Sequence, residues 1–262
     1  MPSVVVLSDA SVRRGTSMLL SDVSWSVDEG ERWVVLGPNG AGKTTLMLIL
    51  AGLMFPTTGS VELLDEVPGA VSMSELRTRI GWASSALAGD IPPRESVLNV
   101  VMTGAHAVTG RWREEYDEQY LTRARGLLVD WGLEEFSNRT FGTLSEGERK
   151  RSLIARSLMA DPELLLLDEP GAGLDLGGRE DLVSRMRRLA LDPGAPTQIV
   201  VTHHVEEIPE GFTHGLLLRG GRVVTSGLLG DVLTSANLSE TFGLPIDVQS
   251  DAGRWHARRA QG

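Results

Sequence analysis

The chain has 262 residues, of which 41% are hydrophobic, and this is enough to bury a substantial core in one compact α/β unit. It carries 35 acidic and 25 basic residues, and the formal charge of -10 argues against a nucleic-acid partner, whose phosphate backbone requires a basic surface. It has no cysteine, which excludes disulfides and thiolate metal sites and fits a reducing compartment.

The first 36 residues are expected to form short β-strands. Apolar, β-rich runs at 4–7, 23–27 and 33–36 alternate with turn signals at 14–15 and 28–30, a pattern typical of β-hairpins. Only the run at 4–7 could serve as the core of a secretory signal, and no basic residue precedes it. We therefore expect the chain to stay in the cytoplasm.

Residues 37–45 carry the most specific motif of the chain. They read GPNGAGKTT, which fits the phosphate-binding pattern G-x-x-x-x-G-K-[ST], and they lie between an apolar run at 33–36 and a helix-like stretch at 46–50. Glycines in such a loop let backbone amides approach a phosphate, and the following helix adds the positive end of its dipole. The residues predicted to bind a nucleoside triphosphate are Gly37, Pro38, Asn39, Gly40, Ala41, Gly42, Lys43, Thr44 and Thr45. Among them, Lys43 is expected to reach the β- and γ-phosphates, and the hydroxyl of Thr44 to hold Mg²⁺.

The segment after the loop helix is expected to alternate strands with helices. A turn at 56–60 leads into a predicted strand at 61–64, a second apolar element lies at 80–83, and the pattern becomes helical from about residue 94. The longest apolar stretch, 46–55, is far shorter than the about 20 residues that a membrane-spanning helix needs. One helix face, expected to pack into the core rather than to stack on bases, carries Tyr116, Tyr120, Leu121, Leu127, Leu128 and Trp131.

Residues 144–148, LSEGE, begin another predicted helix. Ser145 and Glu148 form a capping-box pattern, which leaves the first amides of the helix facing outward. Such a helix tip suits an anion, and Gly147 adds no side chain that would obstruct a phosphate. A simple helix cap accounts for Ser145 and Glu148 but leaves Gly147, a poor helix former, unexplained. The basic cluster at 149–151 is expected to be a solvated helix surface.

Two short apolar runs, 164–167 and 199–201, indicate central parallel strands buried on both faces. Polar side chains at the C-terminal ends of such strands lie where open α/β sheets bind ligands. Asp168 and Glu169 follow the first run, and His203 follows the second after a threonine. An aspartate at this place can hold Mg²⁺ through its water shell, and an adjacent glutamate can activate a water molecule.

The order of these motifs resembles the ATP-binding cassette family, the ATPase subunits of ABC transporters. Five segments stand in the family's order: GPNGAGKTT, LSEGE, LLLLDEP, AGLD ending at Asp175, and VTHH containing His203. The resemblance implies an α/β fold, namely a P-loop NTPase core with a mostly parallel central sheet, an N-terminal antiparallel β-subdomain and an inserted helical subdomain. It implies one domain over 1–262, with a core at about 1–85 and 160–229, a helical subdomain at about 86–159 and a C-terminal extension at about 230–262.

The resemblance also implies roles for the candidate residues. Lys43 and Thr44 would bind ATP with Mg²⁺, and Asp168 would support the metal. Glu169 would be the catalytic base, and His203 would contact the γ-phosphate and position the attacking water, while His204 beside it would be structural.

Similar cassettes form head-to-tail dimers around two ATP molecules, which implies a second copy of this chain as partner. The capped helix would then contact the nucleotide of that copy through Ser145, Gly147 and Glu148, and Asp175 would lie in the dimer seam. Separate membrane-spanning permease subunits would dock on the helical region at about 94–143.

The sequence departs from the family at several positions. The family's glutamine near position 85 is missing, and Ser84 and Ser85 stand there; the hydroxyl of Ser85 is a candidate to bind a metal-bound water. The aromatic side chain that commonly stacks on adenine is also missing. Arg14 is a candidate to stack instead, and a plain surface arginine fits equally well. Ala172 replaces a serine, and Glu146, which replaces a glycine, has no explanation in the sequence.

The leading interpretation is the ATP-hydrolysing subunit of a membrane transporter. The alternative is a soluble cassette ATPase that acts on ribosomes or DNA, and the acidic balance and the lack of a tandem second cassette stand against it. A GTPase or small-molecule kinase would leave LSEGE unexplained, and the chain lacks an N-K-x-D guanine motif. Residues 233–248 resemble the C-terminal extension of importer ATPases for iron-siderophores and vitamin B12; a packed helix and strand, with an exposed tail from Ser250, is the simpler interpretation.

Overall fold

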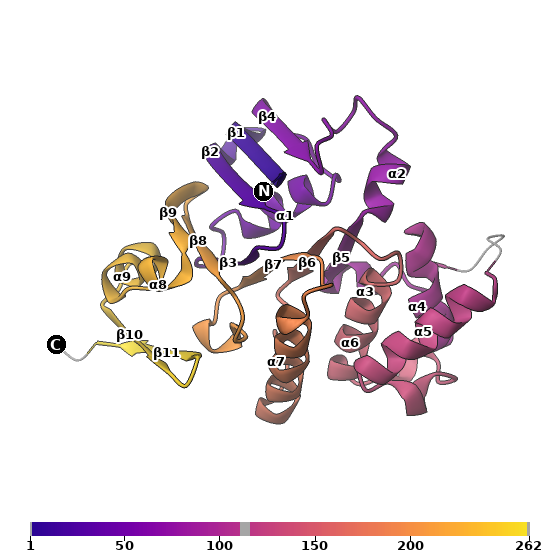
Figure 1. Ribbon diagram of the computed structural model, residues 1–262. Coiled ribbons are helices and arrows are strands. Elements are labelled where there is room, and N and C mark those ends of the chain that lie inside the picture. The colour runs from indigo at the N-terminus through magenta and orange to yellow at the C-terminus, as the bar shows by residue number, and fades with distance from the viewer. Residues whose placement is uncertain (1, 111–115, 261–262) are drawn as a thin grey trace.

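The computed structural model describes residues 2–110 and 116–260 and contains a central six-stranded sheet in the order β5-β6-β7-β3-β8-β9 (Figure 1). Its neighbouring strands run parallel except for the pair of β8 with β9. The strand bounds are β3 Arg32–Leu36, β5 Ile80–Ser84, β6 Leu164–Asp168, β7 Thr197–Thr202, β8 His214–Arg219 and β9 Arg222–Leu228. The expected α/β fold with a mostly parallel central sheet is confirmed.

The central strands are buried on both faces, as their continuous apolar runs predict. Side chains of one strand alternate between two cores: Leu165 and Leu167 enter one cluster, and Leu164 and Leu166 enter the other. Every residue of β7 is buried. A strand covered on both sides needs apolar residues at consecutive positions, which explains why 164–167 and 199–201 lack the alternation of half-exposed strands.

A second, antiparallel sheet has the order β2-β1-β4, with β1 at Ser3–Arg14, β2 at Ser17–Asp28 and β4 at Thr58–Leu63. It covers α1 (Lys43–Leu50), which lies between the two sheets in Figure 1. The turn at 14–15 closes the expected hairpin, but the turn at 28–30 does not. It leads into β3, which pairs in parallel with β7 and β8, because β3 is apolar on both faces and suits the central sheet.

Helices cover the other face of the central sheet. The bounds of the remaining helices are α2 Met73–Thr78, α3 Ser85–Ala88, α4 Val97–Met102, α5 Glu118–Asp130, α6 Glu146–Ser157, α7 Leu176–Leu191, α8 Leu229–Val232 and α9 Ser235–Phe242. Leu153 of α6 and Leu182 of α7 pack into the same core as Leu165 of β6. The predicted helix face packs into this core: Leu128 and the C-cap residue Trp131 are buried and Tyr120 is half-buried, but Tyr116 lies before the first residue of α5. No helix in residues 2–110 and 116–260 is long and apolar enough to span a membrane.

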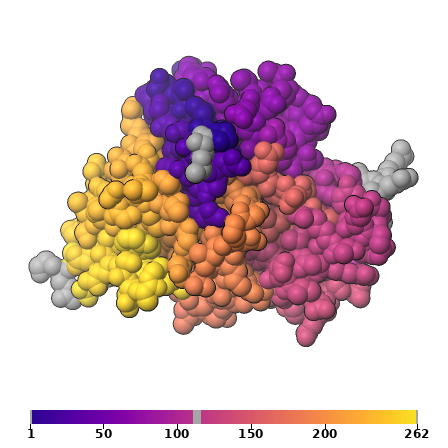
Figure 2. Space-filling model, in the orientation of Figure 1, coloured from indigo at the N-terminus to yellow at the C-terminus, as the bar shows by residue number. Residues whose placement is uncertain are grey.

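The C-terminal segment forms a hairpin, so the expected exposed tail from Ser250 is wrong. Strands β10 (Ile246–Asp251) and β11 (Arg254–Arg259) are joined by a tight turn at Ala252 and Gly253, both with positive φ. Trp255 packs on the main core, and Arg254 donates hydrogen bonds to the Glu180 carboxylate at 2.9 and 3.1 Å. These long-range contacts hold a segment that looks polar in the sequence along one flank of the molecule (Figure 2).

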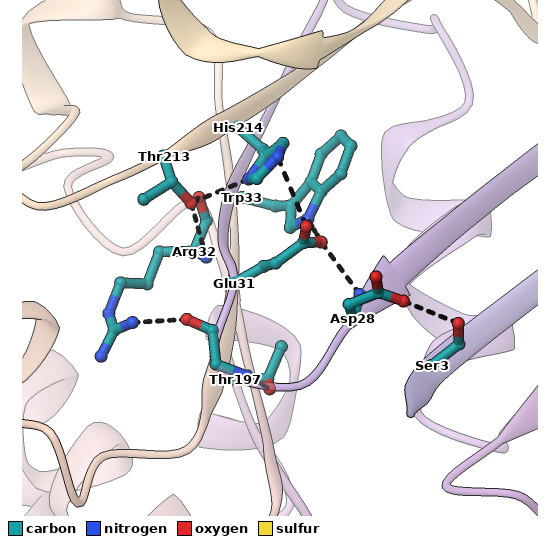
Figure 3. A network of polar contacts seen from close by, with 9 residues as sticks. Ser3, Asp28, Glu31, Arg32, Trp33, Thr197, Thr213 and His214 are labelled. Carbon is teal, nitrogen blue, oxygen red and sulfur yellow. Dashed lines mark hydrogen bonds and ion pairs between the residues drawn. The ribbon is translucent and has the colours of Figure 1, made fainter. Parts of the chain in front are cut away.

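A polar network fixes the edge of the central sheet where β3, β7 and β8 begin (Figure 3). The Glu31 carboxylate accepts hydrogen bonds from the indole of Trp33 at 2.7 Å and from the backbone amide of Asp28 at 2.9 Å. Its other oxygen lies 3.3 Å from Nε2 of His214, whose ring stacks on Trp33. The Thr197 hydroxyl accepts from the Gly30 amide at 2.9 Å. The candidate site lies at the opposite edge of the sheet, where these strands end.

Candidate nucleotide site

Three neighbouring strands of the central sheet deliver the candidate residues to one edge. In the parallel register, Asp168 of β6 lies beside Val201 of β7, and Leu36 of β3 lies beside Thr202 of β7. The phosphate loop follows Leu36, the carboxylates end β6, and the histidines follow Thr202. Three motifs that are far apart in the sequence therefore meet at the C-terminal edge, where open α/β sheets bind ligands.

The phosphate loop depends on its glycines in two different ways. A Cβ atom at Gly37 would lie 2.1 Å from the carbonyl oxygen of Leu218, so the loop passes too close to β8 for any side chain. Gly40 and Gly42 have φ values of 77° and 104°, which favour glycine. Gly42 is also the N-cap of α1 and has no side chain to bond the first amides of the helix. Those amides are free to bind an anion.

Lys43 is buried, with 5% of its surface exposed. Its ammonium group donates hydrogen bonds to the backbone oxygens of Gly37 at 2.7 Å and Pro38 at 3.1 Å, and it lies 4.0 Å from Oε1 of Glu169. Burial lowers the pKa of Lys43, and the charges of Glu169 and Asp168 partly restore it. The loop thus holds a cation between its own backbone and the carboxylates of β6.

Asp168 and Glu169 face different surroundings. Burial and the neighbouring charge of Glu169 raise the pKa of Asp168, while Lys43 acts in the opposite direction. Glu169 adopts a left-handed backbone conformation, with φ 49°, and its amide donates to the Val201 oxygen at 2.9 Å. Its carboxylate oxygen Oε1 lies 3.4 Å from Nδ1 of His203. One carboxylate therefore touches both the phosphate-loop lysine and the histidine after β7.

The histidine next to His203, His204, is exposed and directly precedes a short 3-10 helix, Val205–Glu207. Its amide donates to the Thr202 hydroxyl at 3.1 Å, and that hydroxyl donates to the buried carboxylate of Glu207 at 2.5 Å. The sequence did not single out Glu207. This buried network holds the backbone that carries His203 in place.

The tip of α6 has the predicted capping box. The Ser145 hydroxyl accepts from the Glu148 amide at 3.4 Å, and the Glu148 carboxylate accepts from the Ser145 amide at 2.7 Å. A Cβ atom at Gly147 would meet only Leu174, at an ordinary contact distance of 3.7 Å. Packing within the chain therefore does not require a glycine at 147. Glu146 is exposed in the first helical turn and remains unexplained.

Ser85 and Arg14, the two candidates to replace the missing glutamine and the missing aromatic residue, lie in different places. The Ser84 hydroxyl accepts from the Ala86 amide at 3.2 Å and caps α3, and both Ser84 and Ser85 line a narrow cavity together with Asp168 and Glu169. Arg14 is an exposed residue at the end of β1, where its backbone pairs with Ser17, and its side chain makes no hydrogen bond or ion pair within the described part of the chain.

Lys150 belongs to the site although the sequence placed it on a solvated helix surface, and that expectation is wrong for this residue. Its side chain is 5% exposed, and its ammonium group donates to the backbone oxygens of Glu169 and Ala172. Helical spacing carried the signal: Lys150 shares a face of α6 with Leu153 and Ile154, and both of these are buried.

Comparison with known proteins identifies similar chains over the whole length. Residues 20–172 match the ABC transporter family. A protein of Bacillus subtilis, the uncharacterized ABC transporter ATP-binding protein YlmA, is 41% identical over 98% of this chain and 98% of its own length. The hemin import ATP-binding protein HmuV of Rhodococcus jostii is 34% identical over 91% of this chain and 79% of its own length.

Solved structures show the same likeness. A putative metal-chelate type ABC transporter in an inward-facing conformation matches with a TM-score of 0.77 and 26% identity, covering 100% of this chain and 98% of that one. The dimeric post-hydrolysis state of the cassette MJ0796, bound to ADP and Pi, matches with a TM-score of 0.74 and 26% identity, covering 86% of this chain and 98% of that one.

Proposed function

Because this chain belongs to the ABC transporter family, as an ATP-binding and ATP-hydrolysing subunit of a transporter, we propose that two copies of it close around two MgATP complexes. The phosphate loop of one copy and the α6 tip of the other would hold each ATP. The chain carries one phosphate loop and one LSEGE segment, and Leu176, next to the proposed seam residue Asp175, is 68% exposed. The dimeric structure of the similar cassette MJ0796 supports this arrangement.

The observation that carries the proposal is the position of the Glu169 carboxylate. It lies 4.0 Å from the ammonium group of Lys43 and 3.4 Å from the ring of His203. Lys43 would exchange its bonds to backbone oxygens for phosphate oxygens, since a charged donor binds a charged acceptor more strongly. Glu169 would accept a proton from the attacking water, and His203 would orient that water against the γ-phosphate.

The donor set fits Mg²⁺, because Thr44, Asp168 and Ser85 offer only hydroxyl and carboxylate oxygens. No group of three or more His, Cys, Asp or Glu side chains that could hold a metal ion occurs in the described residues. Mg²⁺ is commonly bound by one or two carboxylates together with substrate phosphates and water. We therefore propose that it binds with ATP, at Thr44 and Asp168, with Ser85 at a metal-bound water; there it would neutralise phosphate charge.

Exchange of the carboxylate for an amide tests the site. Glu169→Gln should bind MgATP, form an ATP-dependent dimer in light scattering, and hydrolyse ATP about 100-fold or more slowly, because the base is gone. Glu62→Gln, which removes one exposed carboxylate from β4, is the matched control and should behave as the parent. Unchanged turnover by Glu169→Gln would remove Glu169 from the mechanism.

A membrane-spanning subunit would dock where the helical region expected at about 94–143 meets β5, so most of the docking residues lie just outside that range. A cavity of about 170 Å³ opens there, lined among others by Leu53, Trp82, Leu87, Gly104 and Arg156. We propose that it receives a side chain from a cytoplasmic helix of a permease, and that this contact holds the chain at the inner face of the membrane. The likeness to a hemin import subunit and to a metal-chelate type transporter supports an importer as the assembly.

Copurification separates this proposal from the ribosome or DNA alternative. The tagged chain should be recovered from detergent extracts with a polytopic membrane protein. Leu53→Glu should prevent that recovery and leave MgATP binding intact. Leu191→Glu, a change at a comparably exposed leucine at the end of α7, should leave the recovery unchanged. Recovery of the parent with ribosomes or DNA would overturn the assignment of a membrane partner.

A further inference from the structure

The buried ammonium group of Lys150 joins the LSEGE helix to the backbone of the proposed catalytic base. Lys150 stands on α6, and its Nζ atom donates to the Glu169 oxygen at 3.2 Å and to the Ala172 oxygen. Of the three basic residues at 149–151, Lys150 is the one whose side chain is buried. Arg149 donates instead to the Gly142 oxygen, and Arg151 pairs with Asp181 on α7.

The carbonyl groups that Lys150 binds belong to one tight turn. The Ala172 amide donates to the Glu169 oxygen at 3.2 Å, so the same oxygen receives both the turn amide and the ammonium group. Glu169 at the start of this turn has a left-handed backbone, a conformation that is unfavourable for a residue with a side chain. The neighbouring strand and Lys150 supply the contacts that hold it there.

The conformation of Glu169 decides where its carboxylate points. With φ at 49°, Oε1 lies 3.4 Å from Nδ1 of His203 and 4.0 Å from Nζ of Lys43, and a change of φ would redirect the Cα–Cβ bond that carries the carboxylate. A shift of about 1 Å in a reacting group can reduce turnover by about 100-fold. Backbone contacts at this turn therefore bear on the reaction and not only on stability.

A lysine at position 150 also needs a reason, because removing a cation from water is unfavourable in free energy. Burial lowers the pKa of Lys150, and the carboxylates of Glu146, Glu207 and Glu169 act against that loss of charge. An apolar side chain of similar volume would fill the same space without desolvating a charge. What lysine adds is a cationic donor that reaches two carbonyl groups of the turn at once.

We propose that Lys150 is a positioning residue, which holds the turn at 169–172 so that Glu169 faces the γ-phosphate. Lys150 lies about 7.5 Å along the axis of α6 from Ser145, at the helix tip proposed to bind the nucleotide of the partner copy. The contact of Lys150 with the turn therefore also links this tip to Glu169 of the same copy. This inference rests on the proposed function of Glu169.

Three variants test it: Lys150→Met removes the ammonium group and keeps the stem, Lys150→Arg keeps the charge, and Arg149→Met is the control on the same helix. Lys150→Met should lower kcat by about 10- to 100-fold through misplacement of the base, with the MgATP dissociation constant within about two-fold of the parent. Lys150→Arg should recover part of the rate, and Arg149→Met should retain it. In a Glu169→Gln background the Lys150→Met change should add little, because it acts through Glu169.

Each outcome is decisive. Parent-like kcat in Lys150→Met, while Glu169→Gln is inactive, overturns the inference and leaves the proposed function standing. A loss of kcat matched by an equal loss of MgATP affinity also overturns it. Parent-like kcat in Glu169→Gln instead overturns the proposed function. If Lys150→Met does not fold, Lys150→Gln, which can still donate to one carbonyl, should show an intermediate kcat at parent-like affinity; parent-like kcat there contradicts the inference.

Discussion

Arg254→Met tests how the C-terminal hairpin is attached to the ATPase core. The guanidinium group donates two hydrogen bonds to Glu180, at 2.9 and 3.1 Å, and one to the Glu206 oxygen, also at 2.9 Å. Arg254 is 29% and Glu180 45% exposed, so solvent screens the pair, and it contributes about 0.5–1 kcal/mol. The bond to the Glu206 oxygen, from a charged donor, adds about 1.5 kcal/mol. Arg254→Met should therefore lower the free energy of unfolding by about 2 kcal/mol in total.

Thermal unfolding measures this loss directly. For a chain of this size, about 2 kcal/mol lowers Tm by roughly 4 °C. Arg258→Met is the control, because Arg258 is an exposed arginine on the same strand. An unchanged Tm in Arg254→Met would show that the hairpin is not held by this side chain, and an equal fall in Arg258→Met would attribute the effect to net charge.

The same ion pair predicts a pH dependence. The hydrogen bond from Arg254 lowers the pKa of Glu180 below its usual value. A carboxyl group with a lowered pKa stabilises the fold above its unfolded pKa of about 4.3, and this contribution is lost as pH falls through the folded pKa. The Tm difference between the parent and Glu180→Gln should therefore be constant from about pH 6 to 8 and shrink below about pH 4. A difference that stays unchanged as the pH falls through the acid range would refute the ion-pair reasoning.

Two further changes test the phosphate loop and the helix tip. Gly37→Ala would place a Cβ atom 2.1 Å from the Leu218 oxygen, so it should lower Tm and abolish MgATP binding together; retention of both in calorimetry would contradict the close approach. Ser145→Ala removes a cap worth about 1 kcal/mol and should weaken ATP-dependent dimerisation in light scattering, with MgATP binding to the monomer unchanged. A parent-like dimer would show that the α6 tip does not bind the partner's nucleotide.

The phosphate loop, the two central strands and the α6 cap could be predicted because each depends on residues close together in the sequence. GPNGAGKTT needs only its neighbours to form a loop before a helix, and Ser145 meets Glu148 within one helical turn. The continuous apolar runs at 164–167 and 199–201 indicate burial on both faces for the same reason.

Features that depend on distant parts of the chain were mispredicted or missed. The turn at 28–30 resembles a hairpin turn, but β3 pairs with β7 and β8, which come more than 150 residues later in the sequence. The polar tail from Ser250 is ordered by contacts with Glu180 and with Glu206. Helical spacing places Lys150 on the buried face of α6, but its partners are backbone carbonyl groups of a distant turn, which the sequence does not reveal.

The C-terminal hairpin shares no strand with either of the larger sheets, and it is attached to the core through side chains and the segment after His203. A unit joined in this way can be gained, lost or exchanged during evolution without altering the strand pairing of the ATPase core.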